Sequence, residues 1–140
     1  MHIFANHKHN LMNVLILGSG GREHAFAYSV IKSALLTKLF VAPGNAGTHE
    51  IATNVDLGIT DFPAIKTFVL ENNISMVIVG PEAPLVEGIY DYFQTEELKH
   101  VNVIGPSKQG AVLEGSKEFA KEFMTRNKVP TAAYKSFTKE

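Results

Sequence analysis

The chain has 140 residues, of which 45% are hydrophobic and 19% are charged, values typical of a globular protein with one hydrophobic core. Its formal net charge is -1 at pH 7, so we expect no electrostatic attraction to nucleic acid or to an anionic membrane. It contains no cysteine, which excludes disulfides and thiolate metal ligands. No apolar run approaches the roughly 20 residues of a membrane span, and we expect a cytoplasmic protein.

The first ten residues lack the apolar core and the cleavage site of a signal peptide. Met12 stands just before the first apolar run, and we expect residues 1–12 to be a disordered extension. His2, His7 and His9 lie in this stretch, but histidines near a flexible terminus rarely form a closed metal site.

Residues 14–24 combine an apolar run with glycines and the start of a helix. A run without polar alternation is typical of a strand that is covered on both faces, as in a parallel sheet. Glycines allow the backbone to turn sharply and to approach a ligand, and the first amides of a helix favour an anion such as phosphate. The alternative is that Gly18 to Gly21 form only a tight turn between strand and helix.

The glycine pattern departs from the dinucleotide-binding fingerprint in two ways. Glu23 stands where G-x-G-x-x-G has its third glycine. The predicted second strand, 39–41, also runs into residues 42–48 without the carboxylate that would hold a ribose hydroxyl. The glycines of 42–48 could instead provide backbone amides for a phosphate or a sugar.

Arg22 lies at the start of the predicted first helix, 22–34, where the helix dipole disfavours a cation unless an anion is present. It is therefore either a phosphate ligand or a solvated surface arginine, whereas Glu23 is more simply a first-turn acid favoured by the dipole. His24 is either a ligand for a loop or substrate, or a structural histidine. The apolar spacing predicts an inward stripe made of Ala25, Phe26, Ser29, Val30 and Ala34.

Strands and helices alternate along the rest of the chain. The expected elements are a short strand in 51–57, a helix entered at 60–63 and closed at 72–73, a strand at 75–79, a helix that buries Leu85, Ile89, Tyr92 and Phe93, and a strand at 101–104. This order predicts an α/β fold with an open, mostly parallel sheet flanked by helices.

In such a sheet the loops at the carboxyl ends of the strands share one edge. We therefore expect residues 18–24, 43–48 and 80–85 to converge on one crevice. Glu82, the carboxylate at the centre of the third loop, could accept hydrogen bonds from sugar hydroxyls or an amine. Otherwise it is a turn residue that faces solvent.

The last part of the chain has a different pattern. One helix is expected to end at 111–113, and another opens at 114–117 with inward Phe119, Ala120, Phe123 and Met124. Residues 132–137 resemble a strand without a partner, so we expect the chain to stop inside a second domain.

Four segments carry a resemblance to a known family: 14–25, 41–48 (containing PGNAGT), 79–86 (GPEAPLV) and 113–117, the last with Pro130 and Thr131. Together they resemble the amino-terminal part of the phosphoribosylamine–glycine ligases, also called glycinamide ribonucleotide synthetases, of the ATP-grasp superfamily. The resemblance covers nearly everything from Met12 onward. It implies a Rossmann-like, pre-ATP-grasp domain over 13–106 and a linker with the start of an ATP-grasp domain over 107–140.

The resemblance also implies a reaction in purine biosynthesis. ATP would phosphorylate the glycine carboxylate, and the amine of 5-phosphoribosylamine would attack the acyl phosphate to give glycinamide ribonucleotide. The implied substrate contacts are Gly20, Gly21, Arg22, Gly44, Asn45 and Glu82. Lys117 matches a position that reaches the ATP phosphates, although it could equally be an ordinary surface lysine.

ATP and Mg²⁺ or Mn²⁺ are the implied cofactors, with metal ligands expected beyond residue 140 and no catalytic residue within this stretch. We therefore expect this chain alone to be inactive, since phosphoryl transfer depends on the metal. Two alternatives stay open at this stage. One is a non-catalytic nucleotide-binding regulatory module, and the other is a different ATP-grasp ligase or carboxylase.

Overall fold

A computed structural model describes residues 11–135 and 137 and contains one five-stranded sheet in the order β3-β2-β1-β4-β5. All neighbouring strands run parallel. The strands are β1 (Met12–Gly18), β2 (Leu36–Pro43), β3 (Thr53–Asn54), β4 (Ile74–Val79) and β5 (Asn102–Ile104). The predicted open parallel α/β sheet is confirmed. Met12 belongs to β1, so the predicted extension is wrong at this residue, and the rest of it, apart from Leu11, lies outside the described residues.

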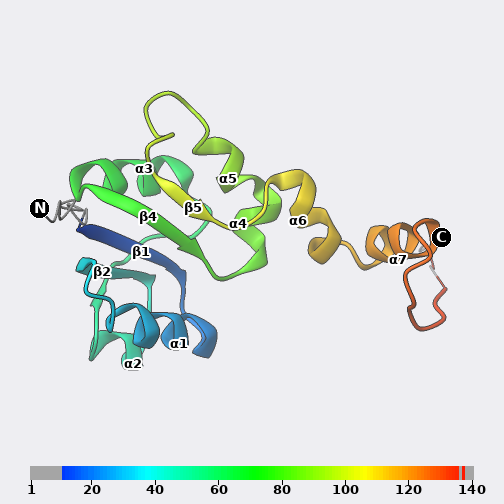
Figure 1. Cartoon of the computed structure of the whole chain (residues 1–140), viewed down its shortest axis with the longest axis horizontal. Coiled ribbons are helices and arrows are strands. Elements are labelled where there is room, and N and C mark those ends of the chain that lie inside the picture. The colour runs from blue at the N-terminus through cyan, green and yellow to red at the C-terminus, as the bar shows by residue number, and fades with distance from the viewer. Residues whose placement is uncertain (1–10, 136, 138–140) are drawn as a thin grey trace, which may run out of the picture.

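Helices cover both faces of the sheet (Figure 1). They are α1 (Gly21–Val30), α2 (Ala46–His49), α3 (Phe62–Glu71), α4 (Glu82–Glu87), α5 (Ile89–Tyr92), α6 (Lys108–Gly115) and α7 (Lys117–Arg126). In Figure 1, α1 and α2 lie on one side of the sheet and α3, α4 and α5 on the other, while α6 and α7 lead away from it. Within the described residues no helix has the length and apolar character needed to cross a membrane.

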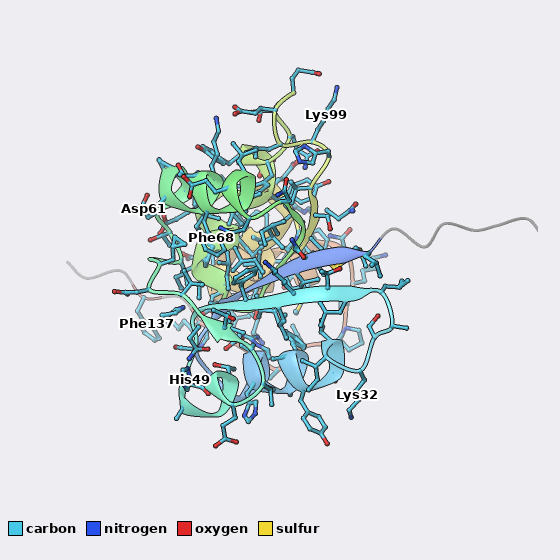
Figure 2. The ribbon with its side chains drawn as sticks, turned by 90° about the vertical axis from the view of Figure 1, so that its left-hand side faces the viewer. Lys32, His49, Asp61, Phe68, Lys99 and Phe137 are labelled. Carbon is cyan, nitrogen blue, oxygen red and sulfur yellow. The ribbon has the colours of Figure 1, made fainter. Side chains whose placement is uncertain are left out.

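The central strand β1 separates two hydrophobic clusters. Leu15 and Leu17 belong to the cluster under α3, α4 and α5, and Val14 and Ile16 to the one under α1. These four side chains are all buried, as expected for a strand that is covered on both faces. Figure 2 shows Phe68 lying between α3 and the sheet. Its ring packs edge-on against the ring of Phe40, with 5.2 Å between the ring centroids.

The inward face of α1 differs from the prediction. Its buried residues are Glu23 and Ala27, whereas most of the predicted stripe is exposed: Ala25, Phe26, Ser29 and Ala34. Only Val30 of that stripe packs against the sheet. The inward face of α1 was predicted wrongly because Glu23 is charged and was not counted as an inward position. The helix also ends at Val30, short of the predicted end at residue 34.

The predicted helix that buries Leu85, Ile89, Tyr92 and Phe93 is divided in two. Leu85, Ile89 and Phe93 are buried as expected, but Gly88 has φ +100° and separates α4 from α5. A residue with a Cβ would be strained at this φ, so the glycine permits the break. The entry to α3 follows the prediction, because the Asp61 side chain caps it by accepting a hydrogen bond from Ala64 N at 3.1 Å.

The last part of the chain differs from the sequence pattern at two places. Helix α7 has no fully buried residue: Phe119 is 38% exposed and Ala120, Phe123 and Met124 are only partly buried, so the expected inward face is incompletely covered by the described residues. Residues 132–135 form no strand, and Ser136 lies outside the described residues. A strand needs a neighbouring edge, and α6 and α7 carry the chain away from the sheet (Figure 1).

Candidate substrate-binding edge

The ends of β1, β2 and β4 meet at one edge of the sheet. Gly44 N donates to Gly18 O at 3.2 Å, and Gly80 N donates to Leu17 O at 3.1 Å. We call residues 18–22, 43–48 and 80–82 the strand-end edge. The predicted convergence of these three loops is therefore present, and it follows from three neighbouring parallel strands ending together.

Glu23 is the buried carboxylate of this edge. The residue is only 4% exposed, and its side chain turns back toward the start of α1. Its Oε2 accepts a hydrogen bond from Gly20 N at 2.7 Å, and its Oε1 lies 3.1 Å from Arg22 Nε. Glu23 therefore supplies an anion beside Arg22, and the cation at the helix start no longer requires a bound phosphate to explain it.

Three glycines make room for the Glu23 side chain, and we call them the glycine cradle: Gly18, Gly20 and Gly80. A Cβ at Gly80 would lie 2.0 Å from Glu23 Oε1, and one at Gly18 would lie 2.6 Å from Glu23 Cγ. Gly18 also has φ +126°, which a larger residue would adopt only under strain. The cradle couples the loop after β1 to the loop after β4.

Asn45 connects the loop after β2 to the loop after β1. Its Nδ2 donates to Ser19 O at 2.8 Å and to Gly20 O at 3.3 Å, while its Oδ1 accepts from Thr48 N at 3.0 Å and caps α2. The side-chain amide is thus engaged within the protein at both ends. In this structure Asn45 shapes the edge rather than presenting a vacant donor to a ligand.

Thr48 and Asn54 hold the same loop from beneath. Thr48 is fully buried, and its Oγ1 accepts from Asn45 N at 2.8 Å and donates to Asn54 Oδ1 at 2.8 Å. Asn54 Nδ2 in turn donates to Asn45 O at 2.8 Å. Gly44, at φ +76°, passes so close that a Cβ there would lie 2.4 Å from Asn54 Oδ1. This glycine therefore serves the packing of the loop.

Four of the predicted contact residues are exposed at the edge: Gly20, Gly21, Arg22 and Glu82. Gly21 is exposed, and a Cβ there would meet no heavy atom within 4 Å. The Arg22 side chain is 53% exposed, and Glu82 is exposed in the first turn of α4. The amides at the start of α1 and the guanidinium of Arg22 are donors suited to a phosphate. Glu82 is an acceptor suited to hydroxyls or an amine.

His24 has a structural position in α1. A Cβ at Gly47 would lie 2.5 Å from His24 Cε1, so the imidazole packs directly against the backbone of α2. Beside it, a hollow of about 340 Å³ is bounded by Gly21, His24, Ala25 and Tyr28. A larger hollow of about 560 Å³ lies at the start of β2, at the opposite end of this strand from residues 43–48.

Lys117 is not brought together with the other predicted site residues. It begins α7, whose start is capped by the Ser116 hydroxyl accepting from Phe119 N at 3.2 Å. Helix α7 packs against α6 and stands off from the sheet (Figure 1). The predicted ATP contact is therefore exposed and separate from the strand-end edge in the described part of the chain.

Sequence reasoning missed Glu23, Thr48 and Asn54 as builders of this edge. The first two had a readable signal, since each stands three residues after a helix N-cap, at Gly20 and Asn45. A glutamate or threonine at this position can bond back to the cap. Asn54 had no such signal, because its role depends on β3 pairing with β2.

The family model and the curated relatives with similar sequences point to one family. The family described as "Phosphoribosylglycinamide synthetase, N domain" matches residues 12–114. Phosphoribosylamine–glycine ligase of Haemophilus influenzae is 52% identical over 130 residues, which cover 91% of this chain and 29% of the relative. The present chain thus spans less than a third of the length of such relatives.

Two solved structures share the fold. The crystal structure of phosphoribosylamine–glycine ligase from Thermotoga maritima aligns with a TM-score of 0.59 and 33% identity, covering 86% of this chain and 26% of that one. N5-carboxyaminoimidazole ribonucleotide synthetase from the same organism aligns with a TM-score of 0.64 over 92% of this chain and 34% of that one. At 17% identity, this second likeness concerns the fold alone.

Proposed function

Because this chain belongs to the phosphoribosylglycinamide synthetase N-domain family, we propose that it binds the ribose 5-phosphate part of 5-phosphoribosylamine within a phosphoribosylamine–glycine ligase. The single observation that carries this proposal is the strand-end edge, where an exposed guanidinium and the start of α1 lie beside the loop after β2. A second function is not needed to account for this edge.

The phosphate is the group that Arg22 and Gly21 suit best. Arg22 uses Nε toward Glu23, which leaves its terminal amino groups to donate to phosphate oxygens. The backbone amides at the start of α1 add partial positive charge on the same side. Gly21 has no side chain to hinder the approach of the phosphate. Gly20, Gly44 and Asn45 contribute by fixing the backbone around it.

Glu82 suits the sugar or the amine. It begins α4 directly after the loop that leaves β4, which is the neighbour of β1 in the sheet. Its carboxylate can accept hydrogen bonds from ribose hydroxyls or from the amino group on C1. Holding the ribose between Arg22 and Glu82 would present the amine in a fixed direction, which favours its attack on an acyl group.

The complete enzyme would join glycine to this amine at the expense of ATP. The glycine carboxylate attacks the γ-phosphate of ATP and releases ADP; the amine then attacks the acyl phosphate, loses a proton and expels phosphate. Lys117 is our candidate contact for the ATP phosphates. A divalent metal would neutralise charge on those phosphates. We propose that its ligands come from the part of the longer relatives that this chain does not span; among the described residues no group of three or more His, Asp or Glu lies together.

We further propose that this chain alone does not catalyse the ligation, since the metal site that phosphoryl transfer requires would come from the rest of the longer relatives. The domain boundary at residues 106 and 107 stays a prediction. Helix α6 packs on α4, where a Cβ at Gly115 would lie 2.6 Å from Val86 Cγ2. We therefore propose that the junction between the two parts lies near Ser116, between α6 and α7.

Three measurements on the 140-residue chain test the proposal. Isothermal titration with ribose 5-phosphate is expected to show binding at one site, and titration with NAD⁺ is expected to show none. An assay for ATP-dependent formation of glycinamide ribonucleotide is expected to detect no product. Binding of NAD⁺ without binding of ribose 5-phosphate would contradict the sugar phosphate site, and ligation by this chain would contradict its inactivity.

A further inference from the structure

We propose that Glu23 determines the specificity of the strand-end edge, because its carboxylate fills the place that a ligand pyrophosphate would need at the glycine turn. The inference deepens the proposed function and rests on it. It assigns to Glu23 the exclusion of dinucleotides and other pyrophosphate compounds in favour of a sugar monophosphate.

The first step of the argument concerns the backbone amide of Gly20. At the start of a helix such an amide has no partner within the helix, and in dinucleotide-binding folds the pyrophosphate is held at this helix start. Here Glu23 Oε2 takes the Gly20 amide at 2.7 Å. The donor that a pyrophosphate would use is therefore already satisfied by an anion of the protein itself.

The second step concerns space. The carboxylate lies within the glycine cradle, where a Cβ at Gly20 would come within 2.9 Å of Oε2 and one at Gly80 within 2.0 Å of Oε1. A side chain that is 5% exposed leaves no room for a second anion between the two loops. A ligand phosphate must therefore bind on the outer side of the turn.

The third step concerns charge. In the ion pair between Arg22 and Glu23, the Glu23 side chain is buried and the Arg22 side chain faces solvent, since they are 5% and 53% exposed. A monophosphate that approaches from solvent meets the guanidinium first and stays farther from the carboxylate. A pyrophosphate, which extends toward the glycine turn, brings a second negative group against the buried carboxylate and is repelled. The arrangement thus favours one phosphate over two.

The test compares two variants of the chain. Glu23→Gln removes the charge and keeps a side chain of the same size, and Glu23→Gly restores the third glycine of the dinucleotide fingerprint. Glu71→Gln is the matched control, since Glu71 is exposed at the end of α3 and its loss changes the net charge equally. For each protein, titration calorimetry measures the affinities for inorganic pyrophosphate and for ribose 5-phosphate, and circular dichroism verifies folding.

We expect the ratio of pyrophosphate affinity to ribose 5-phosphate affinity to rise about tenfold in Glu23→Gln, and further in Glu23→Gly. The ratio in Glu71→Gln should equal that of the unchanged chain. A folded Glu23→Gly variant with an unchanged ratio would overturn the inference; if that variant does not fold, an unchanged ratio in Glu23→Gln would do so. A merely structural role for Glu23 would lower the melting temperature without altering the ratio.

The proposed function and this inference fail separately. If the unchanged chain binds no ribose 5-phosphate, the sugar phosphate site is wrong. In that case only the affinity for pyrophosphate is compared, between the Glu23 variants and Glu71→Gln. A gain supports the exclusion by Glu23, and no gain overturns it.

Discussion

The side-chain amide of Asn45 donates a hydrogen bond to the carbonyl oxygen of Ser19 at 2.8 Å, across 26 residues of sequence. This bond joins the loop after β2 to the loop after β1, directly before Arg22 and the start of α1. The side-chain oxygen of Asn45 caps α2 by accepting a hydrogen bond from Thr48 N. One side chain therefore fixes both the position of the second loop and its distance from the first.

Replacing Asn45 by Asp should separate these two roles. Aspartate still accepts from Thr48 N and caps α2, but it cannot donate to Ser19 O and places a negative charge against that carbonyl. We expect a loss of about 1 to 2 kcal/mol in the free energy of unfolding, measured by urea denaturation. Asn45→Ala should lose the cap as well and be less stable than Asn45→Asp. Equal stability of Asn45→Asp and the unchanged chain would show that the bond to Ser19 contributes nothing.

The hydroxyl of Thr48 should contribute more to the stability of the fold than its methyl group. Thr48→Val keeps the shape of this buried side chain but leaves Asn45 N and Asn54 Oδ1 without their partner. Unpaired buried polar groups cost about 1 to 3 kcal/mol each, so we expect the urea midpoint to fall clearly. Thr67→Val, on the exposed face of α3, is the control and should shift stability by less than about 0.5 kcal/mol. Similar midpoints for both variants would contradict the loop network.

A methyl group at Gly80 should disturb the glycine cradle. In Gly80→Ala the new Cβ would lie 2.0 Å from Glu23 Oε1, so the buried Glu23 carboxylate would have to move from the position in which it accepts a hydrogen bond from Gly20 N. We expect a destabilisation of about 1 to 3 kcal/mol in thermal or urea unfolding. Gly21→Ala adds the same methyl group in open space within α1 and should be neutral or stabilising by up to about 1 kcal/mol. The reverse order would contradict the packing of Glu23.

Arg22 should account for much of the affinity for phosphate. Arg22→Ala removes the guanidinium and is expected to weaken ribose 5-phosphate binding roughly tenfold, because hydrogen bonds to charged groups are among the strongest available. Lys38→Ala, an equal charge change at the opposite end of β2, should leave the affinity unchanged. Titration calorimetry of both variants decides the matter. An equal loss of affinity in the two variants would mean that ribose 5-phosphate responds only to the net charge of the chain, and it would contradict a specific contact with Arg22.

The sequence predicted the sheet well because its signals are local. The run over residues 14–17 has no polar residue, and the structure buries it on both faces. The glycine turn, the cap at Asp61 and the convergence of the strand-end loops follow from short patterns and from the geometry of parallel strands. The resemblance to the ligase family rested on these same loops, and the family match covers them.

The details that were mispredicted depend on tertiary contacts. Glu23 is charged, and only the cradle formed by Gly80, far along the chain, makes its burial possible. The bonds of Asn45 to Ser19 and Thr48 could not be read from the sequence either, and its role as a substrate contact stays a prediction. Local propensity at residues 132–135 favoured a strand, yet no neighbouring strand is placed there.

The most direct test of the central claim is a titration of the ¹⁵N-labelled chain with ribose 5-phosphate, followed by amide chemical shifts. We expect saturable shifts confined to the strand-end edge, at residues 18–22, 43–48 and 80–82, with the largest at Gly21 and Arg22. Unchanged spectra at saturating ligand, or shifts at the start of β2 instead, would contradict the claim that this edge of the sheet binds the sugar phosphate.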